Sequence, residues 1–234
     1  LRPRKRLLLR MILKHAALVT ANSQALADSV ARYSGREVAV IYPACTLQYP
    51  KILISPGEGL RLFSMSRLVH RKGIDIAIRA LNHLPLATLA IAGDGPARGD
   101  LEQLARELGL ESRVEFLGWL DDEAKAREFR KAHIFVMPTR DSGADREGFG
   151  IVYLEAQANG VPVIAGKGIG IEEALHPSLR PYALAHTPET FAESARSLID
   201  KNLSRRELQR YAARFDAKKH AERFWKLVRA LRHS

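Results

Sequence analysis

The sequence predicts an α/β fold, a doubly wound parallel sheet of the Rossmann-like type followed by C-terminal helices. From residue 60 onward, short apolar segments alternate with segments of helical, 3.6-residue periodicity. Segments such as ATLAIA, HIFVM and VPVIA are apolar almost throughout, which is typical of strands buried on both faces of a sheet. Strands and helices in regular alternation build a parallel sheet covered by helices on both sides.

The first 42 residues are expected to contain two helices and two short strands, in the order helix, strand 18–21, helix 23 to about 33, and strand 38–42. Ser23 fits the N-cap of the second helix, because a serine hydroxyl accepts from a free backbone N–H, and Gly35 fits its C-cap. Residues 43–59 lose both periodicities and contain several prolines and glycines, so they are predicted to be a linker.

The repeating part of the chain begins at residue 60. Six strands are expected, at residues 60–65, 88–92, 114–117, 134–137, 161–165 and 182–185. Helices are expected at residues 74–83, 100–108, 122–131, 150–159, 188–200, 205–213 and 217–231. Ser204 and Glu207 fit a capping box at the start of the helix 205–213. The final helix carries an apolar stripe that we expect to be buried, formed by Ala221, Phe224, Trp225, Val228 and Leu231.

Composition excludes several classes of protein. A chain of 234 residues with 46% apolar content can bury a substantial core, and it contains no run of about 20 apolar residues as a membrane span requires. The one cysteine, Cys45, excludes a disulfide framework and indicates a reducing compartment. Because the eight histidines are scattered and form no HExxH motif, we predict no metal site.

The net charge of +11 is compatible with nucleic acid, an anionic membrane surface, phosphorylated substrates or a solvated basic surface. Basic residues near the start of the chain alternate with Leu7, Leu8, Met11 and Ile12, which predicts a basic helix with an apolar side. Such a helix can lie on anionic lipid or pack into a domain outside this chain. We expect a cytoplasmic protein, with the inner face of the membrane as an open alternative.

Cations and glycines follow the predicted strands, where ligands bind in open α/β sheets. These exit segments are Ser66-Arg67 with His70-Arg71-Lys72-Gly73, Gly93-Asp94-Gly95-Pro96, Gly118-Trp119, Pro138-Thr139-Arg140 and Gly166-Lys167-Gly168-Ile169-Gly170. Glycines let a backbone approach a ligand, and helix N-termini attract phosphate. Neither GxxxxGK[ST] nor a GxGxxG after the first strand is present, so Walker-type nucleotide binding and dinucleotide binding lose support.

Two glutamates, Glu147 and Glu155, stand eight residues apart around a glycine-flanked phenylalanine. A helix that starts near Gly150 keeps Glu155 about 7.5 Å along its axis, still near the ligand end of the sheet. One carboxylate can bridge a ribose diol while the other holds sugar hydroxyls. The alternative for Glu155 is an ordinary helix-surface residue, since glutamate favours helices.

A set of short motifs runs through residues 60–175. They are Ser66-Arg67-Leu68-Val69 with Arg71-Lys72-Gly73, Gly93-Asp94-Gly95-Pro96, Val114 with Phe116-Leu117-Gly118, Pro138-Thr139, Glu147-Gly148-Phe149-Gly150, Glu155-Ala156 and Gly160-Val161-Pro162-Val163-Ile164-Ala165. In order and spacing they resemble the donor-binding half of a GT-B glycosyltransferase of the family 4 type (glycosyl transferases group 1). Within that family, GIVYLEAQ and GVPVIAG are similar to the phosphatidylinositol mannoside mannosyltransferases.

The resemblance implies retaining transfer of a sugar from a UDP- or GDP-linked donor to a glycan or lipid-linked acceptor, without a metal or another cofactor. It implies that Arg67 and Lys72 hold the diphosphate and stabilise the leaving group. Glu147 would hold the donor sugar and Glu155 the ribose. The base would lie near Gly93, Gly95, Phe116, Leu117 and Gly118. Further donor contacts would come from Thr139, Gly148, Phe149, Gly150 and Ile151.

Two departures from the family pattern stand out. Ile169 occupies the first of two positions that are usually glycine, which predicts a reshaped donor loop. The family also has an N-terminal acceptor domain, of which this chain is expected to hold only the end, in residues 1–42, followed by the linker 43–59, the donor-binding domain 60–215 and a C-terminal crossing helix 216–234. The start at Leu1 rather than Met agrees with that expectation.

Three hypotheses for function remain open. The first is a glycosyltransferase whose donor half this chain supplies. The second is a non-catalytic module of the same fold that binds a membrane surface or nucleic acid through its basic face, although its basic stretches lack the aromatic residues typical of single-strand binding. The third is a chain that binds donor without turnover, because the acceptor domain is absent. We predict a nucleotide-sugar donor as partner and no nucleic acid.

Overall fold

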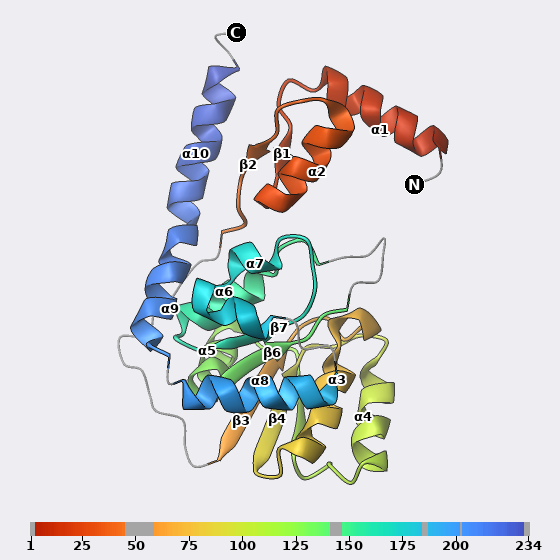
Figure 1. Ribbon diagram of the computed structural model, residues 1–234, viewed down its shortest axis with the longest axis vertical. Helices are drawn as coiled ribbons and strands as arrows, with labels where there is room; N and C mark the ends of the chain where they lie inside the picture. Colours follow the sequence, from red (N-terminus) through yellow and green to blue (C-terminus); the bar gives the residue numbers. More distant parts are fainter. Residues whose placement is uncertain (1–2, 45–58, 141–146, 184–186, 202, 232–234) are drawn as a thin grey trace.

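The central element is a five-stranded, all-parallel sheet, which confirms the predicted doubly wound α/β class. The computed structural model describes residues 3–44, 59–140, 147–183, 187–201 and 203–231. Within them the sheet strands are β3 (Leu60–Met65), β4 (Ala87–Ala92), β5 (Val114–Gly118), β6 (Ile134–Met137) and β7 (Val163–Ala165) (Figure 1). Most of the predicted linker lies outside the described residues.

The strand order, β5-β4-β3-β6-β7, reverses direction once. The chain moves outward from β3 through β4 to β5, then returns to the other side of β3 to build β6 and β7. The point between β3 and β6 is therefore the topological switch point, where ligands of open α/β sheets bind outside the carboxyl ends of the strands.

The strands are buried because their side chains are apolar on both faces. Phe63 of β3 and Phe135 of β6 have no exposed surface, and their rings pack at 5.9 Å between centroids. Phe129 joins them from α5 (Asp122–Lys131), with its ring centroid 5.1 Å from that of Phe63. Burying each such side chain contributes about 1.5–3 kcal/mol, so this aromatic centre fixes β3 beside β6.

Helices cover the sheet as the alternation predicts. The remaining helices of this part are α3 (Ile74–Ala80), α4 (Arg98–Glu107), α6 (Ile151–Ala158), α7 (Ile171–Ala174), α8 (Pro188–Asp200) and α9 (Arg205–Ala212), with 3-10 turns η1 (His70–Lys72), η2 (Leu81–His83), η3 (Pro177–Tyr182) and η4 (Ala213–Phe215). Helix α3 packs against α4 and α8, and α6 packs against α9. Ser204 caps α9 by accepting from the backbone of Glu207 at 3.4 Å.

The predicted strand 182–185 is wrong over its described part. Tyr182 ends the 3-10 turn η3 and Ala183 follows it as a turn residue, while residues 184–186 lie outside the described chain. Two prolines, Pro177 and Pro181, fall within η3. Proline fixes φ near the helical value and offers no N–H to a strand ladder, so it favours this turn over a strand.

The N-terminal unit consists of α1 (Pro3–His15), β1 (Thr20–Ala21), α2 (Gln24–Ser34) and β2 (Ala39–Val40). Its two strands pair in parallel and are shorter than predicted. The predicted caps of α2 are confirmed, since the Ser23 hydroxyl accepts from the backbone of Leu26 and Gly35 adopts φ 69°. A small core of Ala21, Ala27 and Val40 holds the unit together, apart from the main core.

Helix α10 (Ala217–Ala230) runs away from the sheet and alongside the N-terminal unit (Figure 1). The expectation that its apolar stripe is buried is wrong for the described residues, because none of its residues is buried and Trp225 is 56% exposed. Periodicity predicts the helix and its apolar side, but it does not supply a partner for that side. Among the described helices, none is both long and apolar enough to span a bilayer.

Candidate functional site

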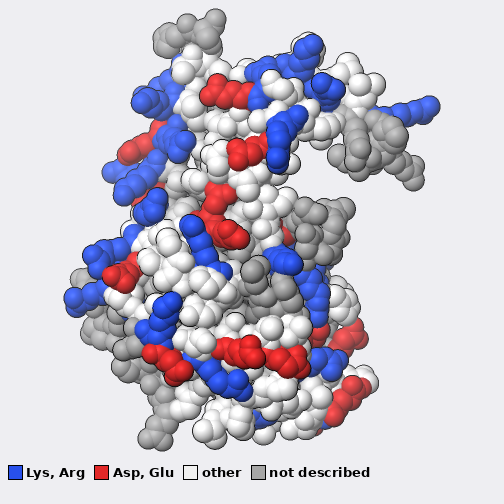
Figure 2. Space-filling view, viewed as in Figure 1, with Lys and Arg blue, Asp and Glu red and all other residues white. Residues whose placement is uncertain are grey.

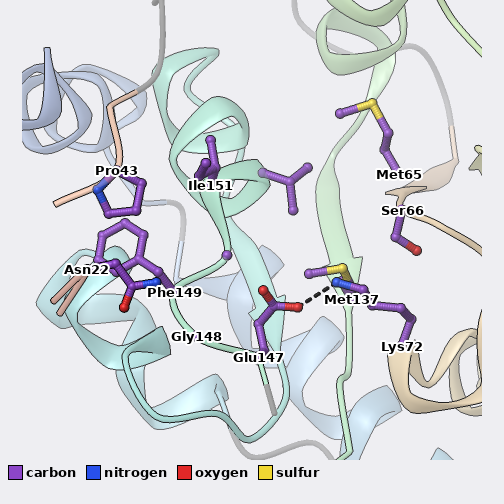
Figure 3. A pocket seen from close by; sticks show the side chains of 12 residues that line it. Asn22, Pro43, Met65, Ser66, Lys72, Met137, Glu147, Gly148, Phe149 and Ile151 are labelled. Atoms are coloured by element: carbon purple, nitrogen blue, oxygen red, sulfur yellow. Dashed lines mark hydrogen bonds and ion pairs between the residues drawn. The ribbon is translucent and has the colours of Figure 1, made fainter. Parts of the chain in front are cut away.

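A cavity of about 330 Å³ opens at the carboxyl ends of β3 and β6, at the switch point of the sheet. Met65 and Met137, the last residues of the two strands, form part of its wall. The complete lining is Asn22, Pro43, Met65, Ser66, Lys72, Met137, Glu147, Gly148, Phe149, Gly150, Ile151 and Val152 (Figure 3). The pocket thus combines the main sheet, the N-terminal unit and the start of α6.

Lys72 and Glu147 meet inside this pocket. The Lys72 ammonium lies 2.5 Å from Glu147 Oε2, and an Arg71 guanidinium nitrogen lies 3.1 Å from the same oxygen (Figure 3). Burial would raise the pKa of the Glu147 carboxyl, but the hydrogen bonds and charges of Lys72 and Arg71 outweigh burial and hold that pKa below its ordinary value. Glu147 is therefore a carboxylate at neutral pH.

The turn that carries Lys72 is held from two sides. Gly73 adopts φ 70°, and a Cβ at that position would lie 2.0 Å from the carbonyl oxygen of Pro138, so only glycine permits the close approach of the β3 and β6 exit segments. Arg140 forms two 2.6 Å hydrogen bonds to Asp75 and donates to the carbonyl of His70 at 3.0 Å. These contacts fix η1, and with it the ammonium of Lys72.

The other wall is the segment 148–150 and the first turn of α6. Gly150 adopts φ 82°, and a Cβ there would lie 2.4 Å from the ring of Tyr153. Phe149 is buried, with its ring 5.7 Å from those of Tyr42 and Phe215. The ring anchors this segment while the first amides of α6, which lack intrahelical acceptors, begin at the cavity.

Three predicted site residues lie outside the lining. Arg67 is exposed on the β3 exit segment. Glu155 is one turn along α6 and pairs with Lys125 of α5 at 3.2 Å. Thr139 is fully buried, and its hydroxyl donates to the carbonyl of Lys167 at 3.0 Å.

The residues predicted to lie near the base occupy the outer strands. A Cβ on Gly93 would lie 2.0 Å from the Ser66 carbonyl oxygen, and one on Gly95 would lie 2.4 Å from that of Leu68. The backbone of Gly93 donates to Gly118 at 2.6 Å, which ties the β4 exit to the end of β5. Phe116 and Leu117 are half-buried on β5. Their segment continues the edge of the sheet away from the pocket, as an extended ligand requires.

Six lining residues were not among the predicted site residues, namely Asn22, Pro43, Met65, Ser66, Met137 and Val152. Strand ends could have indicated Met65, Ser66 and Met137, whereas nothing in the sequence brings Asn22 or Pro43 to this place. Ser66 Oγ and Asn22 Oδ1 are buried and receive no hydrogen bond from any described residue. Buried polar atoms of this kind suit a polar ligand, because leaving them unpaired costs about 1–3 kcal/mol each.

A second hollow, of about 550 Å³, lies along α10 and is lined by Lys218, Ala221, Glu222, Trp225, Lys226 and Arg229. It is larger than the switch-point pocket, but a single exposed helix forms it and no strand end reaches it. We therefore place the candidate site at the switch point. Within the described residues, no three His, Cys, Asp or Glu side chains gather as a metal site would require.

The arrangement suits an anionic ligand that also carries hydroxyl groups. Fixed cations and helix amides favour phosphate, and a carboxylate beside neutral polar groups favours hydroxyls. A pocket of this size holds a monosaccharide-sized group better than a whole nucleotide, so the rest of a longer ligand would extend along the sheet edge toward β4 and β5.

Comparison with known proteins agrees with this geometry. The family model described as glycosyl transferases group 1 matches residues 48–215. A GDP-mannose-dependent alpha-(1-6)-phosphatidylinositol monomannoside mannosyltransferase of Mycolicibacterium smegmatis is 45% identical over 117 residues, which cover 47% of this chain and 31% of that protein. Its monoacylated-substrate counterpart in Corynebacterium glutamicum is 40% identical over 146 residues, which cover 60% of this chain and 38% of that protein. The chain thus spans about a third of the length of these relatives.

Solved structures share the fold over almost the whole chain. Anabaena HepE in complex with UDP matches with a TM-score of 0.80 and 23% identity, covering 96% of this chain and 67% of that one. Sucrose-phosphate synthase of Thermosynechococcus elongatus matches with a TM-score of 0.79 and 23% identity, covering 97% and 61%. At these identities the likeness establishes the architecture, including the N-terminal unit and the terminal helix.

Proposed function

The chain belongs to the glycosyl transferases group 1 family, and on that premise we propose that it supplies the donor-binding half of a retaining hexosyltransferase. The donor is a nucleotide diphosphate sugar, and the acceptor is a glycan or a lipid-linked glycan. The pairing of Lys72 with Glu147 at the switch point carries the proposal, because it puts a cation for phosphate and a carboxylate for sugar hydroxyls into one pocket.

Lys72 acts on the leaving group. As the bond between sugar and diphosphate breaks, negative charge grows on the diphosphate, and a cation fixed in advance stabilises that charge without reorganisation. An ammonium has three donors, so Lys72 can keep its hydrogen bond to Glu147 while it binds a phosphate oxygen. Arg67, on the same exit segment, adds a second cation, and the role requires no metal.

Glu147 and Glu155 divide the remainder of the donor between them. Glu147 lines the pocket and accepts from sugar hydroxyls, which orients the ring against the diphosphate. Glu155 lies outside the pocket on the next turn of α6 and binds the ribose diol. Lys125 holds the Glu155 side chain at 3.2 Å, on the side from which the nucleoside would approach.

The acceptor half belongs to chain that these residues do not include, since the relatives are about three times as long. We therefore expect this chain to bind donor without turnover. Envelope glycans are the proposed acceptors, because the relatives act on phosphatidylinositol monomannoside or, for one of Rhizobium meliloti at 39% identity, in lipopolysaccharide core biosynthesis, as their names state.

Isothermal titration with UDP, GDP, ADP and inorganic pyrophosphate tests the site. The unmodified chain should bind at least one nucleoside diphosphate, and Lys72→Ala should weaken nucleotide and pyrophosphate alike by about tenfold or more, because a charge-assisted hydrogen bond is lost. Arg106→Ala, an exposed cation on α4, is the matched control and should change neither affinity.

Glu155→Ala separates the ribose from the phosphates in the same titration. If Glu155 binds the ribose, the variant loses nucleoside diphosphate affinity and keeps pyrophosphate affinity. Equal affinities for both ligands in variant and unmodified chain would leave Glu155 as the structural partner of Lys125 and refute its proposed role.

A further inference from the structure

Asn22 reaches the donor pocket from the N-terminal unit. It follows β1 and precedes α2, yet it lies beside Phe149 and Gly148, across the pocket from Ser66 (Figure 3). The lining residues that carry charge, Lys72 and Glu147, both belong to the main sheet domain. Asn22 is therefore the polar contribution of the N-terminal unit to this pocket, among the described residues.

A carboxylate of the sheet domain holds this part of the N-terminal unit in place. Glu173 of α7 accepts from the backbone N–H groups of Gln24 and Ala25 at 2.8 and 2.9 Å, which are free amides at the start of α2. Glu173 also accepts from the Tyr42 hydroxyl at 2.9 Å. Burial and the neighbouring Glu173 raise the pKa of Tyr42 to about 12, so the hydroxyl stays protonated and keeps donating.

Packing adds to these hydrogen bonds. A Cβ on Gly170 would lie 2.5 Å from Ser23 Cβ, so the residue next to Asn22 sits directly against the α7 segment. The Tyr42 ring packs 5.7 Å from Phe149, the residue that anchors the pocket wall. The position of Asn22 is thus set by contacts on both sides of it.

The amide of Asn22 is suited to a hydroxyl-bearing ligand. Its Oδ1 is buried and receives no hydrogen bond from the described residues, while its Nδ2 would lie 3.0 Å from a Cβ on Gly148. Buried polar atoms are nearly always paired in native proteins. An amide both donates and accepts, as a sugar hydroxyl does, and it adds no charge beside the Glu147 carboxylate.

We propose that Asn22 hydrogen-bonds a hydroxyl of the transferred sugar, and that Glu173 is the positioning residue that holds Asn22 in the pocket. This inference rests on the proposed function, since it assigns a contact within the donor site. Part of the donor specificity is then set by the N-terminal unit, across the boundary between the two parts of the chain.

The test compares nucleotide sugar with nucleotide in the complete chain. Titrations with GDP-mannose and GDP, and with UDP-glucose and UDP, give the affinity that the sugar adds. For the pair that binds, Asn22→Ala should lose about three- to tenfold in nucleotide-sugar affinity, the size of one net hydrogen bond, and leave nucleotide affinity unchanged. Gln24→Ala, two residues away and exposed, is the matched control and should change neither.

Glu173→Gln tests the positioning role. It should lower the sugar's contribution when Asn22 is present and have little further effect in the Asn22→Ala background, because the two residues act through one contact. A merely structural Glu173 would instead lower the affinities for nucleotide and nucleotide sugar equally in both backgrounds. Asn22→Asp, which keeps the shape but places a charge beside Glu147, should lose at least as much as Asn22→Ala and serves if the alanine variant does not fold.

An unchanged ratio of the two affinities in both Asn22 variants would overturn the inference and leave the proposed function standing. Failure of the unmodified chain to bind any of the four ligands would overturn the proposed function, and the inference with it.

Discussion

Glu147 and Lys72 control one another in the empty pocket. Each is largely buried, with 16% and 12% of its side chain exposed, and an unpaired charge at either position would be strongly disfavoured. The low pKa of Glu147 keeps the pair ionised, and the fixed turn η1 keeps Lys72 aimed at the strand ends. The site therefore holds its charges ready before a donor arrives.

His133 gives the fold a pH dependence that is separate from the site. Its Nδ1 accepts from the backbone of Arg61 at 3.0 Å, and its backbone donates to Arg61 at 2.9 Å, joining the starts of β6 and β3. Burial, with the charge of Arg205, lowers the pKa of His133 below 6.5. Protonation would also remove the acceptor that the Arg61 N–H requires.

The sign follows from linkage. Because the folded state resists protonation, the stability that His133 provides is complete above its unfolded pKa and is lost as pH falls from there through the folded pKa. Urea denaturation at pH 7.5 and pH 5.5 should show a larger loss for the unmodified chain than for His133→Asn, by about 1 kcal/mol. His176 and His220, whose pKa values are also lowered by burial, contribute equally to both proteins. Identical losses would contradict this role for His133.

The strand exits depend on glycine where two backbones touch. At Gly93 the positive φ of 110° and the nearby Ser66 carbonyl both exclude a side chain. Gly93→Ala should destabilise the chain by about 2 kcal/mol or more and displace Ser66, a lining residue of the pocket.

Gly99 is the control within the next helix. A Cβ there meets nothing within 4 Å, so Gly99→Ala should leave stability unchanged or raise it by up to about 1 kcal/mol. Thermal unfolding of the two variants measures both effects. Equal melting temperatures would show that the β4 exit tolerates a side chain.

The same elements show what local patterns can predict. Apolar runs and helical periodicity predict β3 and β6 to the residue, because burial on both faces leaves a signal in every position. The strand prediction at 182–185 fails because the apolar pattern there belongs to a 3-10 turn set by Pro177 and Pro181. Pairing of Lys72 with Glu147 follows from motif and topology together, since both residues flank neighbouring strands.

Contacts between distant segments left no such signal. The place of Asn22 depends on Glu173, which is 149 residues from Gln24 in the chain, and on the packing of Ser23 against Gly170. Likewise, nothing in the sequence near Glu155 indicates that Lys125 pairs with it. Such contacts arise from tertiary packing, which composition and periodicity do not encode.

Charge over the whole molecule is uneven. Lys and Arg gather along α10 and over the N-terminal unit on the face shown in Figure 2, where α10 alone contains Lys218, Lys219, Arg223, Lys226 and Arg229. Leu7, Leu8, Met11 and Ile12 of α1 are exposed beside this basic region. The donor site lies between this part of the molecule and the sheet, so anionic donors are attracted toward it over distances comparable to the Debye length.

The arrangement as a whole makes the switch point the place where three parts of the chain meet. Tyr42 of the N-terminal unit contacts Phe149 of the pocket wall, and its ring lies 6.1 Å from that of His220 in α10. A donor in the pocket therefore contacts the sheet domain directly and the N-terminal unit through Asn22. The central claim is that a nucleotide sugar binds at this junction.

A crystal structure of the chain with GDP-mannose or UDP-glucose tests that claim most directly. We predict the diphosphate beside Lys72, the sugar between Glu147 and Asn22, and the nucleoside along the edge toward β4 and β5. Electron density for the donor along α10, or anywhere away from the ends of β3 and β6, would contradict the account.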